Sequence, residues 1–277
     1  MIYNRPEYWL AKTKTVVPYL TFSSPSSFTL AVADATKHWD GTLEYSTNKT
    51  TWDTWDETTT LSSATSGSDN VLYLRGTGNT KFGYYAEDVD DYIPWVINGT
   101  DVRCDGNIET LLDYATVEAG QHPVMAEACF GGLFLACKAL ITPPELPATT
   151  LAAGCYDSMF YGCTSLTQVP ALPATTLASY CYFYMFYGCP NLTQVPALPA
   201  TTLAEGCYSN MFYGCIKIKL SSTQTEEYTQ EYRIPTTGTG TTATSALNKM
   251  FTDTRGTFAG TPVINTTYYL SNTNTVV

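Results

Sequence analysis

Residues 146–171 read LPATTLAAGCYDSMFYGCTSLTQVPA, residues 172–197 read LPATTLASYCYFYMFYGCPNLTQVPA, and residues 198–215 read LPATTLAEGCYSNMFYGC. The three copies follow one another with a period of 26 residues. Self-similarity at such a period is typical of stacked repeats, in which each unit buries its apolar face only against its neighbours. The sequence therefore predicts a solenoid over this part of the chain.

The array extends beyond the three clear copies. VMAEACFGGLFLACKAL, which starts at residue 124, matches the same period and adds a fourth unit. After Cys215 the register breaks, and SALNKMFTDT, residues 245–254, resembles the SNMFYGC segment after an insertion of 13 residues. We therefore expect four repeats over residues 125–216, and an insertion, a degenerate repeat and a C-terminal cap over residues 217–277.

Within one repeat, apolar residues recur at every fourth position. They are Leu151, Cys155, Met159 and Cys163. This spacing predicts that the residues share one face of a helix. The following SLTQVPAL, residues 165–172, alternates in the way that a short strand does. Each unit is therefore expected to contain one helix and one strand.

The cysteines and methionines of the repeats are expected to form ladders in the core. Two cysteines of one unit are eight residues apart, which is about 12 Å along a helix and too far for a disulfide. We expect most of them to be reduced and to act as small buried hydrophobes, with bridges between adjacent repeats as the open alternative. The ladder residues are Cys129, Cys155, Cys181, Cys207, Cys137, Cys163, Cys189, Cys215, Met159, Met185 and Met211.

A β-sandwich domain is expected over residues 19–92, after an N-terminal arm of residues 1–18. Short runs rich in β-branched and aromatic residues alternate there with polar turns. The spacing in WDTW places Trp52 and Trp55 on opposite faces of a strand, so at most one of the two is expected to face solvent. Residues 93–124 are expected to form a junction and the N-terminal cap of the solenoid. The candidate strands are 27–32, 41–47, 51–55, 71–75 and 81–85.

The run MFYGCTSLTQVPALP, residues 159–173, resembles the BspA-like, or Treponema-type, leucine-rich repeat. That family has an aromatic residue, a cysteine, a leucine, an aliphatic residue and a proline in each unit. Here those positions are Phe160, Cys163, Leu166, Val169 and Pro170. The Thr-rich LPATTL segment and the methionine of MFYGC depart from the family pattern. The resemblance implies an α/β leucine-rich-repeat solenoid that binds a partner, in surface and adhesin-like proteins of host-associated bacteria and in gut phages, with no shared catalytic residues.

Charge and hydropathy exclude several classes of protein. Acidic residues outnumber basic ones 25 to 14, and a net charge of −11 repels nucleic-acid phosphates. The sequence contains no stretch of about 20 apolar residues, so membrane insertion is not expected. The first 20 residues lack a continuous apolar region, so we expect no secretory signal. A phage structural protein released by lysis fits this pattern, and so does an adhesin whose signal has been removed.

Catalytic, metal and cofactor sites find little support. The two histidines, His38 and His122, leave few choices for a catalytic pair and are interpreted as surface or capping residues. A glycan-acting enzyme would need paired carboxylates across a cleft, which no spacing in the sequence indicates. The sequence contains no CxxC pair, so zinc binding through cysteines is not expected. No cofactor is expected either. The acidic junction of residues 87–105 could collect calcium ligands, but it lacks the loop spacing of a calcium site and is interpreted as a solvated turn.

The tyrosines of the repeats give the candidate binding surface. A repeat places identical side chains about 5 Å apart, so an exposed column of tyrosines would present a flat aromatic strip suited to sugars or a protein partner. Tyr156, Tyr182 and Tyr208 are expected in the core, whereas the column of Tyr161 is expected at the surface. The candidate binding residues are Tyr161, Tyr187, Tyr213, Tyr184, Gln168 and Gln194.

We therefore predict a non-enzymatic binding or structural protein that is displayed on a surface. The repeat, the polar uncharged composition and the missing signal favour a phage virion component, such as a head or tail fibre or a decoration protein, that contacts a host surface glycan or protein. Its N-terminal arm or domain would contact other virion proteins, and we expect a homo-oligomer. A bacterial cell-surface adhesin with BspA-like repeats is the alternative, and a glycan-acting enzyme is a second one.

Overall fold

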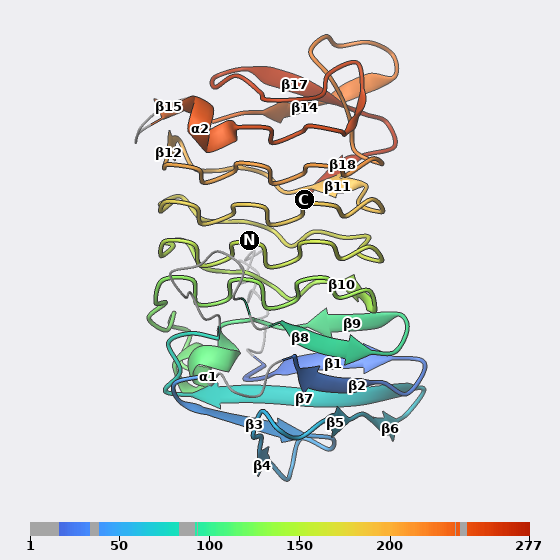
Figure 1. Cartoon of the computed structure of the whole chain (residues 1–277), viewed down its shortest axis with the longest axis vertical. Coiled ribbons are helices and arrows are strands. Elements are labelled where there is room, and N and C mark those ends of the chain that lie inside the picture. The colour runs from blue at the N-terminus through green and yellow to red at the C-terminus, as the bar shows by residue number, and fades with distance from the viewer. Residues whose placement is uncertain (1–16, 34–38, 83–91, 93, 236, 239–242) are drawn as a thin grey trace, which may run out of the picture.

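The computed structural model describes residues 17–33, 39–82, 92, 94–235, 237–238 and 243–277. In Figure 1 the chain forms layers along its long axis, with the N-terminal strands at one end and the C-terminal strands at the other. Among the described residues, strands are far more frequent than helices. Among the described residues the strands form several small, separate sheets, none of them closed.

Two sheets form the N-terminal end of the molecule. The larger has the strand order β10-β9-β1-β7-β3-β4, with β6 paired to β7, and the smaller has the order β5-β2-β8. Neighbouring strands are antiparallel except for β9 and β10, which run parallel and join the N-terminal sheet to the first repeat unit. The strands are β1 (Leu20–Ser24), β2 (Thr29–Val32), β3 (Thr42–Ser46), β4 (Asp53–Thr54), β5 (Leu61–Ser62), β6 (Ala64–Ser66), β7 (Asp69–Thr77), β8 (Trp95–Asn98), β9 (Val102–Asp105) and β10 (Leu140–Thr142).

Four of the five candidate strands correspond to observed ones. Strands β2, β3 and β4 lie within the predicted ranges, and β7 contains residues 71–75. The fifth candidate, 81–85, is not a strand at residues 81 and 82, and its remainder lies outside the described residues. Trp55 and Trp95 are buried at 2% exposure and Trp52 is half-buried, which agrees with the expectation that at most one of Trp52 and Trp55 faces solvent. The strand itself covers only the two exposed residues between them, so it does not show the predicted alternation.

The C-terminal end is also built from strands. Strands β13 (Lys219–Ser221), β14 (Tyr228–Arg233), β16 (Arg255–Gly256) and β17 (Thr267–Ser271) form one sheet in the order β14-β17-β13-β16. Two parallel pairs tie this end to the repeats. They are β11 (Gln194–Val195) with β18 (Thr275–Val276), and β12 (Thr202–Leu203) with β15 (Thr237–Gly238).

The predicted α/β leucine-rich-repeat solenoid is wrong, because the repeat units contain turns in place of helices. Residues 153–162, which were expected to be helical, form consecutive turns, and so do the equivalent residues of the other units. The two helices of the described chain lie outside the four units. They are α1 (Thr110–Glu118), which is interrupted by non-helical dihedral angles at Asp113, and the short α2 (Ala243–Leu247).

Backbone hydrogen bonds explain how the turns replace a helix. The N–H of Met159 donates to the Tyr156 carbonyl, three residues earlier, whereas the N–H of the next residue, Phe160, donates to Met185 of the following unit at 3.0 Å. This alternation continues along residues 154–163, so every second N–H links one unit to the next. An α-helix would instead direct each N–H to the carbonyl four residues earlier. The same residues thus form a stack held by bonds between units.

Every fourth residue of these turns has a left-handed backbone. In the second unit these residues are Gly154, Ser158 and Gly162, with φ of 57°, 53° and 68°. A left-handed residue interrupts a right-handed helix. Apolar residues at every fourth position also drift by about 40° per step around a helix of 3.6 residues per turn. The strict four-residue spacing therefore matches the four-residue turns better than the helix that we predicted.

Stacked rings run through the buried core. Phe134, Phe160, Phe186, Phe212 and Phe251 form one column with neighbouring centroids 5.5–5.6 Å apart and interplanar angles of 9° or less. The ring of Phe251 stacks on Phe212, so segment 245–254 continues the column beyond the four units. All the ladder cysteines and methionines lie in this core, and all nine cysteines of the chain are free and buried.

Candidate functional site

Two columns of tyrosines run along the repeats in different environments. Tyr156, Tyr182 and Tyr208 are buried at 0–1% exposure and stack on one another and on Phe130. The second column, which we call the tyrosine strip, consists of Tyr161, Tyr187 and Tyr213. Its rings stack with centroids 4.7 Å apart, and Tyr161 is 36% exposed.

The tyrosine strip presents ring edges to solvent. The Tyr161 and Tyr187 planes are parallel, at 0°, and Tyr213 lies at 14° to Tyr187, so each ring covers a face of its neighbour. The flat aromatic surface expected from the sequence is therefore wrong for the middle of the strip. What repeats along it is a row of phenol edges, and Tyr213 is held at the far end by a hydrogen bond with Asp253, which raises the pKa of that tyrosine.

The strip ends at Tyr161 because the preceding unit has no ring in register. The residue 26 positions earlier is Leu135, and the N–H of the next residue, Ala136, donates to the Tyr161 carbonyl at 2.6 Å. A pocket of about 510 Å³, which we call the aromatic pocket, lies at this end of the strip. It is lined by Tyr92, Pro94, Leu135, Asp157, Ser158, Tyr161, Phe183 and Tyr184.

Two glycines of the first unit make room for one wall of the aromatic pocket. A Cβ at Gly132 would lie 2.4 Å from Cβ and Cγ of Tyr92, and a Cβ at Gly131 would lie 2.6 Å from its Cε1. Tyr92 therefore packs directly against this stretch of backbone. The second unit carries Asp157 and Ser158 at the same two positions. The GG of FGGLFLAC is the sequence signal of this close approach, and the tyrosine columns from which the site was predicted do not contain it.

Steeply angled rings form another part of the lining. Phe183 and Tyr184 meet at 71° with centroids 4.1 Å apart, and Tyr184 lies at 62° to Tyr161 with centroids 6.2 Å apart. Tyr184 has a left-handed backbone, with φ of 51°, which is uncommon for a residue of this size. Its position in the unit is that of Ser158, so the third unit places a large ring where the second has a hydroxyl.

Asp157 is the one carboxylate of the aromatic pocket among the described lining residues. Its side chain is buried, and Oδ1 accepts a hydrogen bond from the Ser158 hydroxyl at 2.8 Å. Burial raises the pKa of Asp157 to about 6, and the hydrogen bonds from Ser158 and Tyr92 act in the opposite direction. The carboxylate is therefore held in a partly desolvated site beside aromatic rings.

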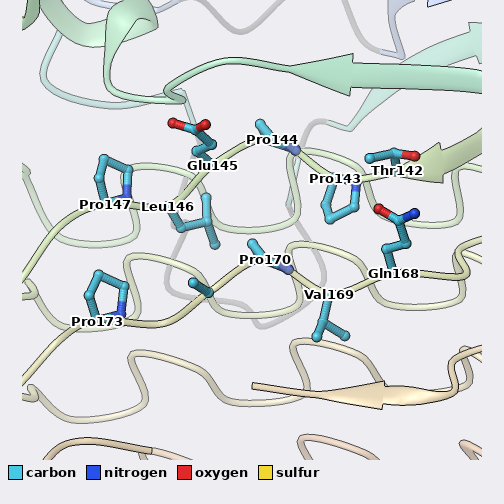
Figure 2. A pocket seen from close by; sticks show the side chains of 11 residues that line it. Thr142, Pro143, Pro144, Glu145, Leu146, Pro147, Gln168, Val169, Pro170 and Pro173 are labelled. Carbon is cyan, nitrogen blue, oxygen red and sulfur yellow. The ribbon is translucent and has the colours of Figure 1, made fainter. Parts of the chain in front are cut away.

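The predicted glutamines lie elsewhere. Gln168 is exposed and lines a second pocket of about 370 Å³, where Figure 2 shows it beside prolines such as Pro143 and Pro170. No residue lines both this pocket and the aromatic pocket. Gln194 belongs to β11, and its Oε1 accepts the Val169 N–H at 3.4 Å. The structure thus brings Tyr161, Tyr184 and Tyr187 together but leaves the two glutamines out.

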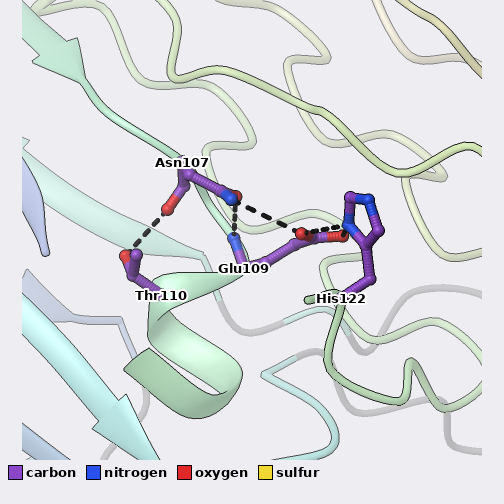
Figure 3. A network of polar contacts seen from close by, with 4 residues as sticks. All are labelled: Asn107, Glu109, Thr110 and His122. Atoms are coloured by element: carbon purple, nitrogen blue, oxygen red, sulfur yellow. Dashed lines mark hydrogen bonds and ion pairs between the residues drawn. The ribbon is translucent and has the colours of Figure 1, made fainter. Parts of the chain in front are cut away.

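A buried glutamate holds the histidine that we interpreted as a capping residue. Glu109 is 1% exposed, and its Oε2 lies 2.7 Å from Nδ1 of His122 (Figure 3). The Glu109 N–H donates to the Asn107 side chain at 2.8 Å, which fixes the start of α1. A pocket of about 330 Å³ beside the pair is lined in part by Thr149 and Thr150. His38 lies outside the described residues.

Metal and membrane features can be assessed only for the described residues. Within them, no group of three or more His, Cys, Asp or Glu side chains is placed to hold a metal ion. The acidic residues 87–91 of the suggested calcium site lie outside this part of the chain. No helix that the structure describes is long and apolar enough to cross a bilayer.

Comparison with known proteins gives no assignment. No family model matches the sequence, and neither a curated protein nor a solved structure matches it. The resemblance to BspA-like repeats therefore stays a prediction, and function has to be argued from the site.

Proposed function

We propose that this protein is a non-enzymatic binding protein, displayed on a surface, that recognises a host surface glycan through the aromatic pocket and the tyrosine strip. The observation that carries the proposal is the position of the aromatic pocket at the end of the tyrosine strip, where the column of stacked rings stops at Tyr161. A ring that ends a column has a face without a stacking partner from its own column. Such a face can pack against the apolar face of a sugar ring.

The aromatic pocket has the composition of a ligand site. Its volume of about 510 Å³ falls within the range of small-molecule pockets, which are mostly apolar with a few polar groups that orient the ligand. The polar groups here are the Asp157 carboxylate and the Ser158 hydroxyl. Sugars combine apolar C–H faces with hydroxyl groups, so they match both kinds of surface. The phenol edges of the tyrosine strip extend the contact along the repeats.

Display on a virion remains part of the proposal. A chain with only 14% charged residues and a net charge of −11 has a polar surface made mainly of uncharged side chains. This composition suits an extracellular or virion protein, with the bacterial cell surface as the alternative location. The N-terminal arm that would contact other virion proteins lies outside the described residues apart from its last two. The homo-oligomer also stays a prediction.

A glycan-binding screen with the full chain tests the proposal. Tyr161→Ala is expected to weaken binding of the retained glycan by about tenfold, because an aromatic contact contributes about 1 kcal/mol beyond the area that it buries. Tyr269→Ala is the matched control, since Tyr269 is half-buried on β17, far along the chain from the aromatic pocket. Retention of no glycan, or equal loss in both variants, would refute the proposal. Cleavage of the glycan during incubation would instead favour the alternative that the protein is a glycan-acting enzyme.

A further inference from the structure

We infer that the aromatic pocket binds a quaternary ammonium group, with Asp157 as its counter-ion and the surrounding rings as its walls. This inference rests on the proposed function and specifies it further, because the group would be a substituent of the glycan that lies on the tyrosine strip. The ligand chemistry is that of a trimethylammonium head, a cation that donates no hydrogen bonds.

The arrangement of the rings is the first argument. Tyr92, Tyr161, Phe183 and Tyr184 all line the aromatic pocket. Phe183 and Tyr184 meet at 71°, and Tyr161 and Tyr184 at 62°, so the rings form corners. A cation is attracted to the face of an aromatic ring, so several ring faces at steep angles to one another can surround a compact cation. The angles therefore favour a compact cationic group.

The charge of the site is the second argument. Among the described residues that line the aromatic pocket, none is a lysine, an arginine or a histidine. Asp157 is buried there with the hydroxyl groups of Ser158 and Tyr92 as its partners, and burial raises its pKa. A buried carboxylate gains most from a ligand that supplies the missing positive charge. A neutral sugar would leave that charge uncompensated.

Hydrogen-bonding capacity separates a quaternary ammonium from a primary one. A primary ammonium carries three N–H donors, each of which needs an acceptor when it is desolvated. The aromatic pocket offers few, because Oδ1 of Asp157 already accepts from Ser158. Most of the remaining lining is carbon from Pro94, Leu135 and the rings. A methylated ammonium needs only the carboxylate charge and the ring faces.

The test compares choline with its neutral isostere, 3,3-dimethyl-1-butanol, in titration calorimetry of the full chain. Choline is expected to bind one site, at least about tenfold more tightly than the alcohol, because the cation–π attraction of the rings and the charge of Asp157 favour only the charged ligand. Ethanolamine, which carries a primary ammonium, is expected to bind more weakly than choline. Equal affinities for choline and the alcohol, or no saturable choline binding, would overturn the inference.

Titration of Asp157 provides a second measurement that needs no variant. The described groups next to the carboxylate are Ser158, Tyr92 and Tyr184, none of which changes charge between pH 5 and 8. Choline affinity should therefore fall by about tenfold between pH 8 and pH 5, while binding of the alcohol stays constant. A choline affinity that does not change over this range would contradict the role of Asp157.

A matched pair of variants separates the effect of the Asp157 charge on choline binding from the effect of lowering the net charge of the protein. Asp157→Asn keeps an oxygen acceptor for Ser158 but loses the charge, so choline binding should fall by about tenfold or more. Asp53→Asn removes the same charge from the exposed strand β4 and should bind choline normally. Equal effects of the two variants would refute the site. Glycan retention without any choline binding would overturn this inference alone, whereas choline binding without glycan retention would overturn the proposed function and, with it, the assignment of the ammonium group to a glycan.

Discussion

Replacing Asp157 by asparagine should stabilise the folded protein at high pH. The pKa of this carboxyl is raised from 3.8 to about 6 by burial, so the folded chain binds the proton more tightly than the unfolded chain does. The associated stability is fully present below about pH 4 and is lost as the pH rises through about 6. At about 1.4 kcal/mol per pKa unit, the loss at pH 8 is about 3 kcal/mol.

The asparagine that replaces Asp157 carries no charge, so the variant should not lose about 3 kcal/mol of folding stability between pH 4 and pH 8, as the wild type does. Its amide oxygen can still accept the Ser158 hydroxyl, which leaves the local hydrogen bond in place. At about 2–4 °C per kcal/mol for a chain of this size, the Tm at pH 8 should rise by roughly 6–12 °C relative to the wild type. At pH 4 the two proteins should melt together.

Thermal unfolding by circular dichroism at pH 4, 6 and 8 measures this difference directly. Asp53→Asn serves as the control, because it removes one carboxyl from the exposed strand β4, whose residues do not line the aromatic pocket. A variant that melts below the wild type at pH 8 would refute the reasoning, and so would a difference in Tm that is the same at all three values of pH. In either case Asp157 would not be a desolvated carboxylate.

Three further predictions concern packing and the thiols. Gly132→Ala should lower the Tm and weaken ligand binding, because φ is +61° there and the new Cβ would lie 2.4 Å from the Tyr92 side chain; melting and calorimetry check both effects. Phe186→Ala should cost about 3–5 kcal/mol in the free energy of unfolding, since the ring is fully buried between two stacked neighbours; a cost below about 1 kcal/mol in denaturant titration would contradict the ring column. The thiols of the folded protein should resist alkylation at pH 8, because burial raises the pKa of Cys189 and Cys207 to about 12; mass spectrometry after iodoacetamide treatment, with unfolded protein as the control, should show rapid labelling only after unfolding.

The repeat period and the identity of neighbouring side chains follow directly from the sequence. Identical residues 26 positions apart must be neighbours when units stack, and Phe160 does contact Phe186 and the preceding Phe134. The local backbone is harder to predict, because apolar residues at every fourth position fit both a helix and a four-residue turn. Gly154 and Gly162, eight residues apart and both left-handed, are the residues that favour the turn.

The candidate site could be predicted only in part. Tyr161, Tyr184 and Tyr187 belong to adjacent repeat units, so the 26-residue period predicts that they lie close together. The aromatic pocket also needs Tyr92, which precedes the first unit and is brought there by the tertiary fold. Asp157 gave no signal in the sequence, because a carboxylate becomes unusual only once its burial is known.

The alternation of backbone hydrogen bonds has an evolutionary consequence. In the first three units every second N–H of the turns donates to a carbonyl 25 residues later, so the same set of backbone bonds joins each of these units to the next. Duplication of residues 172–197 would add one tyrosine to the strip and one phenylalanine to the core column, but it would also require the Tyr180 ring to move, because a Cβ at the position of Gly206 lies 2.4 Å from that ring. The aromatic pocket would stay single, because it depends on Gly131 and Gly132, which occur only in the first unit. Under the proposed function, recombination would therefore lengthen the tyrosine strip in steps of one unit and leave the aromatic pocket unchanged.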